Sequence, residues 1–229
     1  RQTLHFVDKK KLLVEFPVSL MGREFLLGSK VVETSDMGNG PAGTMSYTPR
    51  HIKFAVVDST LYMKEVSRTG QNMIFSSSAN QNMQEGLKKN SLSTIVDAFT
   101  IAAFNKDSSA VVVDMTSYFV SHTENMNPFS SGKRTMEYGS GRQAVKFKDD
   151  LSYLMGVKAF EDNVSIISKL TYLMNLSVGG QLVSVDEPVS ITVNRTLLLL
   201  PEKPQMRPRL ADPRIGIGTV AMENMGTEV

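Results

Sequence analysis

The sequence contains no cysteine and no long apolar segment. Without cysteine, disulfide bonds and thiolate metal sites are excluded. This suits an oxidising compartment without redox partners, although it does not by itself fix the compartment. No apolar run approaches the roughly 20 residues that a membrane-spanning helix needs. The opening residues, RQTLHFVDKKK, also lack the apolar core of a signal peptide.

Positive and negative side chains are nearly equal in number. The 25 Lys and Arg and 23 Asp and Glu give a net charge of +2, which is too small to indicate nucleic acid or an acidic membrane as a partner. The 41% hydrophobic and 21% charged fractions are typical of a soluble globular chain. Its 229 residues suffice for one large or two small domains. Because the chain begins with Arg1 and not Met, we expect a fragment or processed form with any targeting sequence upstream.

The motifs of common catalytic sites are also missing. The histidines His5, His51 and His122 are far apart, and there is no H-E-x-x-H motif of a zinc peptidase. The chain has the Ser, His and Asp residues that a Ser–His–Asp triad needs, so their number does not exclude one, but no G-x-S-x-G motif is present. A G-x-G-x-x-G pattern begins at Gly38. A dinucleotide site needs a helix to start at such a loop, and Pro41 with the non-helical residues after it favours a simple loop.

In the first half of the chain, apolar and polar residues alternate with the period of two that is typical of strands. Arg50–Val57 and Thr60–Val66 are predicted to pair around a tight turn at Asp58-Ser59, and the alternation places His51 on an exposed face. Leu92–Phe104 fits helix or strand, and we favour strand in its second half. Other strands are expected at Leu12–Phe16, Glu24–Thr34 and Ala110–Asp114. Short helices are expected near Pro17–Gly22, Asn80–Asn90 and Thr116–Val120.

A polar segment, Ser121–Arg142, separates the two halves and is predicted to be a long loop whose Met126, Phe129 and Met136 pack against the domain. After it the chain becomes more regular. Breaks are expected at Asp149-Asp150, Glu161–Asn163 and Gly179-Gly180. Four strands are predicted at Val145–Phe147, Tyr153–Phe160, Val164–Leu176 and Val189–Leu200. The predicted fold class is α+β and β-rich, with antiparallel sheets and a few short helices.

The final predicted strand leads into LLLLPEKPQMRPRLADPRIG, Leu197–Gly216. Four prolines in this segment make helix or central strand improbable, and they restrict the chain before it binds anything. Arg207, Arg209, Asp212 and Arg214 are candidates for ion pairs with each other or with a neighbouring surface. A solvated linker is the alternative interpretation.

This junction resembles the one in large bacterial zinc-dependent metallopeptidases of the Met-zincin group. There it follows an N-terminal domain of unknown function and leads into the catalytic domain. FPVSLMGREFLLGSKVVET, Phe16–Thr34, is similar to the opening of that N-terminal domain. Weaker matches continue in the family's order at Arg50–Val66, Asn90–Phe104 and Ser109–Phe119. At Ile217 the sequence departs from the aromatic residue of the family pattern.

The resemblance implies a non-catalytic region of a secreted or periplasmic zinc metallopeptidase, docking on or positioning its protease domain and shaping substrate access. Residues 1–200 would be a β-rich domain and residues 201–229 the junction, with docking residues Arg207, Arg209, Asp212 and Arg214. No catalytic residue or cofactor is expected in this chain, because zinc would belong to the catalytic domain of the same polypeptide. An extracytoplasmic location follows from the resemblance. The alternative is an independent binding module for peptide, glycan or a partner protein.

Overall fold

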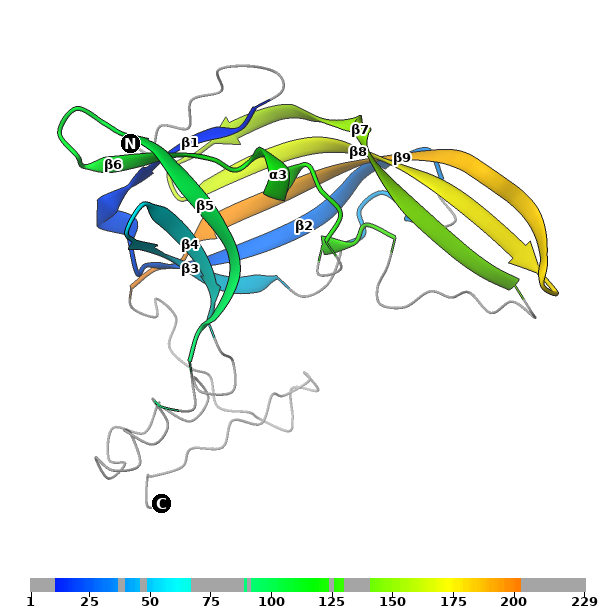
Figure 1. Ribbon diagram of the computed structural model, residues 1–229, viewed down its shortest axis with the longest axis horizontal. Helices are drawn as coiled ribbons and strands as arrows, with labels where there is room; N and C mark the ends of the chain where they lie inside the picture. The colour runs from blue at the N-terminus through cyan, green and yellow to red at the C-terminus, as the bar shows by residue number, and fades with distance from the viewer. Residues whose placement is uncertain are drawn as a thin grey trace, which may run out of the picture.

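The computed structural model describes residues 11–36, 40–45, 49–66, 89, 92–123, 126–129 and 141–202, and the side chains of residues 141–143 are not described. Nine strands form one antiparallel sheet in the order β1-β6-β5-β4-β3-β2-β9-β8-β7 (Figure 1). Their bounds are β1 Leu13–Pro17, β2 Glu24–Thr34, β3 Arg50–Val57, β4 Thr60–Glu65, β5 Thr94–Phe104, β6 Ala110–Asp114, β7 Gly141–Ala159, β8 Asn163–Val178 and β9 Gln181–Leu199.

The sheet is curled, because its two edge strands contribute to the same core. Val14 on β1 and Leu154 on β7 belong to one buried cluster, although β1 and β7 lie at opposite ends of the strand order. Phe16, Phe25 and Phe54 form the aromatic centre of this cluster, with ring centroids 4.7–6.1 Å apart. Burying one face of each strand explains the alternating pattern along β1 and β2.

A second buried cluster lies further along β8 and β9. It is built around Tyr172 and Ile191, neither of which has exposed surface. Phe129 packs against it with its ring centroid 4.6 Å from that of Tyr172, and Met126 is buried in the first cluster. These contacts confirm that part of the long polar segment packs down. Met136 lies outside the described residues.

The described part of the chain has two short helical elements, and Lys89 and Met126 are single helical positions outside them. The 3-10 turn η1, Val18–Leu20, follows Pro17 as expected. The helical turn α3, Thr116–Phe119, is preceded by Asp114, whose carboxylate accepts a hydrogen bond from the Thr116 N–H at 2.9 Å. The antiparallel β-rich prediction is therefore confirmed, but the α+β label fits only loosely. Of the helix predicted at Asn80–Asn90 only Lys89 is described, and it is helical.

Three local predictions were wrong. Asp149-Asp150 does not break the chain, because β7 runs through it with a register shift between Lys148 and Tyr153. The backbone stays attached there since the Thr171 N–H donates to Ser152 Oγ at 2.9 Å. His51 is not exposed, because its Nε2 lies 2.8 Å from Glu24 Oε2 on the neighbouring strand.

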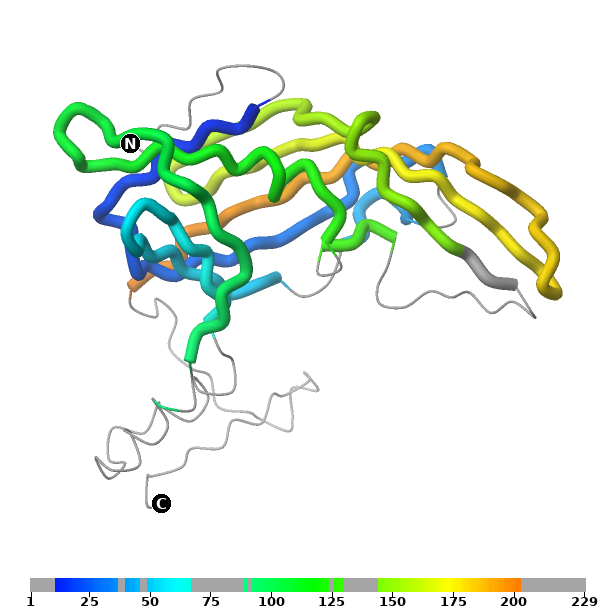
Figure 2. The backbone as a smooth tube through the Cα atoms, in the orientation of Figure 1, coloured from blue at the N-terminus to red at the C-terminus, as the bar shows by residue number. Residues whose placement is uncertain are grey.

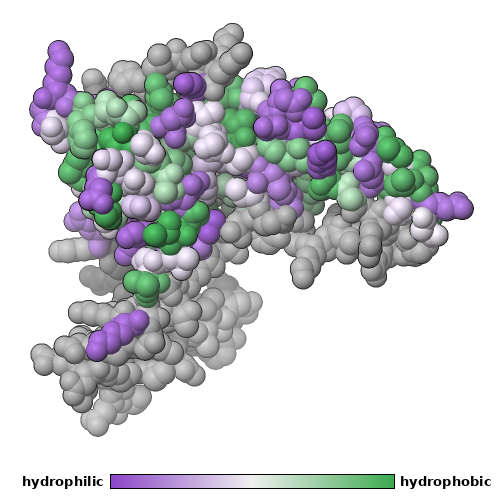
Figure 3. Space-filling model, viewed as in Figure 1, coloured by the Kyte–Doolittle hydropathy of each residue, from purple (hydrophilic) through white to green (hydrophobic). Residues whose placement is uncertain are grey.

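The third wrong prediction is the start of the last strand. β9 begins at Gln181 and not at Val189, because pairing with β8 continues to the turn at Gly179-Gly180. Both glycines have positive φ, +59° and +82°, which this tight turn requires. The far parts of β7, β8 and β9 extend beyond the rest of the sheet as an arm (Figure 2). Its end exposes the apolar side chains Leu182, Val183 and Val185 (Figure 3).

Candidate binding cleft between the sheet edges

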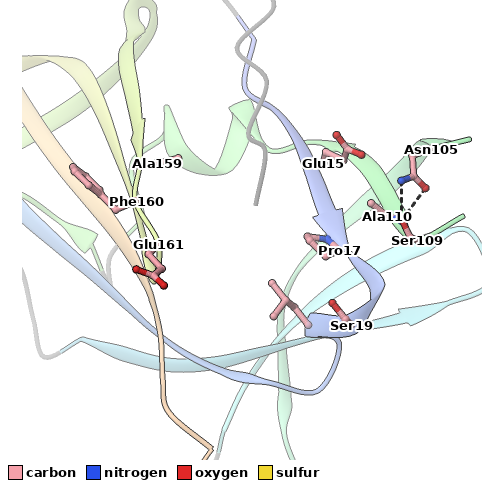
Figure 4. Close-up of a pocket in the computed structure, with 10 residues that line it drawn as sticks. Glu15, Pro17, Ser19, Asn105, Ser109, Ala110, Ala159, Phe160 and Glu161 are labelled. Atoms are coloured by element: carbon pink, nitrogen blue, oxygen red, sulfur yellow. Dashed lines mark hydrogen bonds between the residues drawn. The ribbon is translucent and has the colours of Figure 1, made fainter. Parts of the chain in front are cut away.

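A cleft of about 890 Å³ opens where the curled sheet brings its two edges toward each other. Figure 4 shows its two walls, with Glu15 and Pro17 on β1 across the opening from the turn between β7 and β8, which carries Phe160 and Glu161. The remaining lining residues are Ser19, Leu20, Asn105, Ser109, Ala110 and Ala159. Each wall belongs to an edge element, since β1 pairs with β6 and β7 pairs with β8. Sheet edges of this kind are common sites of polypeptide recognition.

The walls of the cleft are held in place by local hydrogen bonds. The Asn105 side chain donates to Ser109 Oγ and accepts from the Ala110 N–H, both at 2.9 Å. The Val18 N–H donates to the Ser109 carbonyl at 2.8 Å, which ties η1 to the start of β6. The turn between β7 and β8 is closed by Phe160 N–H donating to Asn163 O at 2.8 Å. The cleft is therefore bounded by fixed backbone on both sides.

The cleft has acidic lining residues, and an apolar crevice adjoins it. Glu15 and Glu161 are charged lining residues, and the part of the chain that the structure describes contributes no Lys or Arg to the lining. Next to the mouth, a crevice of about 40 Å³ shares Glu15, Pro17 and Leu20 with it and reaches the first core cluster. The crevice is lined there by Phe16, Phe25, Met115, Phe119, Val14, Val164, Ile166 and Leu197. Phe160 at the mouth is itself exposed. This arrangement suits a ligand with basic and apolar groups in alternation.

The chain leaves the sheet at the same end as the cleft. At the end of β9, the Leu199 N–H donates to the Asp162 carbonyl at 2.8 Å, and the Leu200 N–H donates to Glu24 O at 2.9 Å. Arg23 donates to the Leu200 carbonyl at 3.0 Å and forms an ion pair with Glu202, also at 3.0 Å. Whatever follows Glu202 therefore starts beside the turn that forms one wall of the cleft.

A buried arginine lies in the interior of the sheet behind this end. Arg195 has no exposed surface. Its Nη1 donates to the carbonyls of Tyr118 and Phe119 at 3.0 and 2.8 Å, and its Nη2 donates to the Ser121 carbonyl at 2.7 Å. Ser168 Oγ also donates to the Phe119 carbonyl, at 3.0 Å. Together these groups fasten α3 and the residues after it to β8 and β9.

Burial changes the acid–base properties of this region. Loss of hydration lowers the pKa of Arg195 to about 10, while Tyr172 and Tyr118 act in the opposite direction. Arg195 therefore keeps its charge near pH 7, compensated by three carbonyl oxygens. Burial also raises the pKa of Tyr118, and the positive charges of Arg50 and Arg195 oppose that rise. Arg50 is near, but no hydrogen bond of acceptable geometry reaches the Tyr118 hydroxyl.

A second depression, of about 450 Å³, lies beside Tyr118 and is lined by Arg50, Asp97 and Thr123 among others. Arg50 forms an ion pair with Glu65 at 2.6 Å. The hydroxyls of Tyr118 and Thr123 have no hydrogen-bond partner among the described residues, but both oxygens are closed to solvent. A ligand in this depression would not reach the two hydroxyls. The cleft at the sheet edges is therefore the better candidate for a binding site.

The residues predicted from the sequence as docking residues, Arg207, Arg209, Asp212 and Arg214, all lie outside the described residues. The cleft and Arg195 were not predicted. Arg195 did have a signal in the sequence, because it continues the inward-facing series of Val189, Ile191 and Val193 on β9. Within the described ranges, no group of three or more His, Cys, Asp or Glu is arranged to hold a metal ion. Nor does any helix there have the length and apolar character to cross a bilayer.

Fold and cleft together define a β-rich domain with a cleft between the edges of one curled sheet. Residues 43–228 match the model of a family described as Domain of unknown function (DUF5117). Because this match covers most of the chain, the chain belongs to that family. The family description states no activity, so the link to metallopeptidases remains a prediction. No curated protein and no solved structure matched the chain.

Proposed function

We propose that this chain is the non-catalytic N-terminal region of a secreted or periplasmic zinc-dependent metallopeptidase. In this proposal the end of the domain that carries the cleft docks on the protease domain, positions it and shapes substrate access. The metallopeptidase and the extracytoplasmic location come from the resemblance of the junction and of Phe16–Thr34 to that group. The docking surface comes from the geometry of the sheet.

The observation that carries the proposal is the shared position of the cleft and the chain exit. The strand that leads to the junction ends beside Asp162, one residue from Glu161 in the cleft wall. A following domain attached by a short, proline-stiffened junction is held near this end, which raises its effective concentration at the cleft. The exposed Phe160 then supplies an apolar contact at the centre of the contact surface.

The proposal is tested in the longer protein that contains the residues after Val229. Those residues should include H-E-x-x-H. Phe160→Asp should uncouple the two domains, so that calorimetry shows two separate thermal transitions, and should change kcat/KM on a protein substrate. Val185→Asp is the matched control, because Val185 is equally apolar and exposed but lies near the opposite end of β8 and β9. Identical behaviour of the two variants would exclude the cleft as the docking surface.

A second candidate is an independent extracytoplasmic module that binds a peptide, a glycan or a partner protein with no peptidase attached. The volume of the cleft and its position between two edge elements favour a peptide among these ligands. Absence of H-E-x-x-H from the following residues, together with peptide binding that Phe160→Asp abolishes, would support this candidate over the first.

A further inference from the structure

We propose that the cleft is filled in cis by the chain's own segment Met206–Leu210. The segment would lie extended between β1 and the turn joining β7 to β8. This rests on the proposed function only in treating the cleft as a docking surface for polypeptide, and it goes further by naming the occupant. The junction would then be fixed to this domain before any following domain makes contact.

The chain exit brings the segment within reach. Arg23 holds Leu200 and Glu202 at the end of the sheet where the cleft opens. Met206 is four residues beyond Glu202, and an extended chain covers at most about 14 Å over that length. Leu199 already contacts Asp162, the neighbour of Glu161. The segment therefore needs to cross only the turn between β7 and β8 to enter the cleft.

The charges of cleft and segment are opposite. Glu161 and Glu15 stand on the two walls, and none of the described residues that line the cleft is basic. The segment contains Arg207 and Arg209 and no acidic residue between Met206 and Leu210. Exposed ion pairs contribute only about 0.2–1 kcal/mol each, so they select the orientation of the segment more than they hold it.

The pattern of the segment supplies the apolar part of the fit. In an extended chain successive side chains point to opposite sides. Arg207 and Arg209 would then face the acidic mouth, while Met206, Pro208 and Leu210 face Leu20 and the crevice above Phe25. Pro208 restricts the free chain to extended conformations, which lowers the entropy lost on docking. The sequence alone predicted that these arginines dock on a following domain. The position where the chain leaves the sheet favours the cleft of this domain, which is nearer.

Cysteine cross-linking tests the proposal in the complete 229-residue chain, which has no cysteine of its own. Ser19→Cys/Ala211→Cys places one thiol in the cleft lining and one just after the segment, and leaves the proposed contacts intact. Under mild oxidation at low protein concentration we expect an intramolecular disulfide in most molecules. Glu187→Cys/Ala211→Cys, with the first thiol on the arm, is the control and should form little.

Charge variants on the Ser19→Cys/Ala211→Cys background separate docking from chance encounter. Glu161→Arg, or Arg209→Glu, should lower the cross-linking rate about threefold, as expected for one exposed ion pair, and combining both substitutions should restore it. The proposal would be overturned if the Glu187→Cys/Ala211→Cys control formed its disulfide at the same rate, or if the charge substitutions left the cross-linking rate unchanged. Formation of intermolecular dimers alone would also overturn it. Such a failure would leave the proposed function intact, because domain coupling through Phe160 is measured in the longer protein.

Discussion

The guanidinium of Arg195 donates a hydrogen bond to the carbonyl oxygen of Phe119 at 2.8 Å, across 76 positions of sequence. This bond joins the strand before the chain exit to the helical turn after β6. Phe119 in turn lines the apolar crevice below the cleft. The interior arginine therefore positions one residue of the crevice that adjoins the candidate binding site.

Arg195→Met is expected to lower the free energy of unfolding by about 2–4 kcal/mol. Two effects compete, because the variant removes a costly buried charge but also removes three hydrogen bonds to carbonyl oxygens. In the variant, the Phe119 carbonyl still accepts a hydrogen bond from Ser168 Oγ, and the Tyr118 carbonyl still accepts one from Ser121 Oγ. The Ser121 carbonyl loses the bond from Arg195. We expect the loss of donors to dominate. Urea denaturation measures the change. The control is Lys158→Met at an exposed position, whose free energy of unfolding should stay within about 0.5 kcal/mol of that of the wild type.

Tyr118→Phe is expected to stabilise the protein by about 1 kcal/mol at pH 7, because it removes a buried hydroxyl that has no hydrogen-bond partner. The gain should grow with rising pH. The folded-state pKa of Tyr118 is raised above its ordinary value of 10.0. Above pH 10 the unfolded tyrosine loses its proton while the folded one keeps it, so wild-type stability falls. Chemical denaturation at pH 7 and above pH 10 tests this, and a gain that shrinks with pH would contradict it.

The hairpin between β3 and β4 gives a prediction about backbone conformation. Asp58 has φ of +53°, a left-handed conformation in which β-branched residues are strained. Asp58→Val should therefore destabilise the protein by about 1–2 kcal/mol, and Asp58→Gly should be neutral or slightly stabilising. Ser59→Val is the neighbouring control at an exposed turn position with φ that is not positive. Equal losses for Asp58→Val and Ser59→Val in thermal unfolding would show that the conformation of Asp58 is not the cause.

The 229-residue chain is expected to bind no stoichiometric zinc and to have no peptidase activity, because it contains no H-E-x-x-H motif. Metal analysis after dialysis and a casein assay with and without added zinc test this. One tightly held zinc ion per chain would contradict the prediction and remove the reason for placing the metal site in another domain.

Local patterns in the sequence predicted most strands well. β2, β3 and β6 have the predicted bounds, and the turn at Asp58 was found because two alternating strands meet there with two residues between them. Alternation and turn residues act over a few positions, so the sequence displays them directly. Asp149-Asp150 failed as a break because a register shift absorbs residues without ending a strand, and that depends on the partner β8.

The sequence by itself determined a β-rich antiparallel domain without thiol chemistry, and it shows a proline-rich segment with three arginines after the last strand. Tertiary structure decided that the sheet curls, that β1 and the turn after β7 become the two walls of one cleft, and that Arg195 finds three carbonyl partners. The physical reason is separation along the chain. Glu15 and Glu161 line one cleft only after nine strands have paired in a particular order, and no pattern within a strand specifies that order.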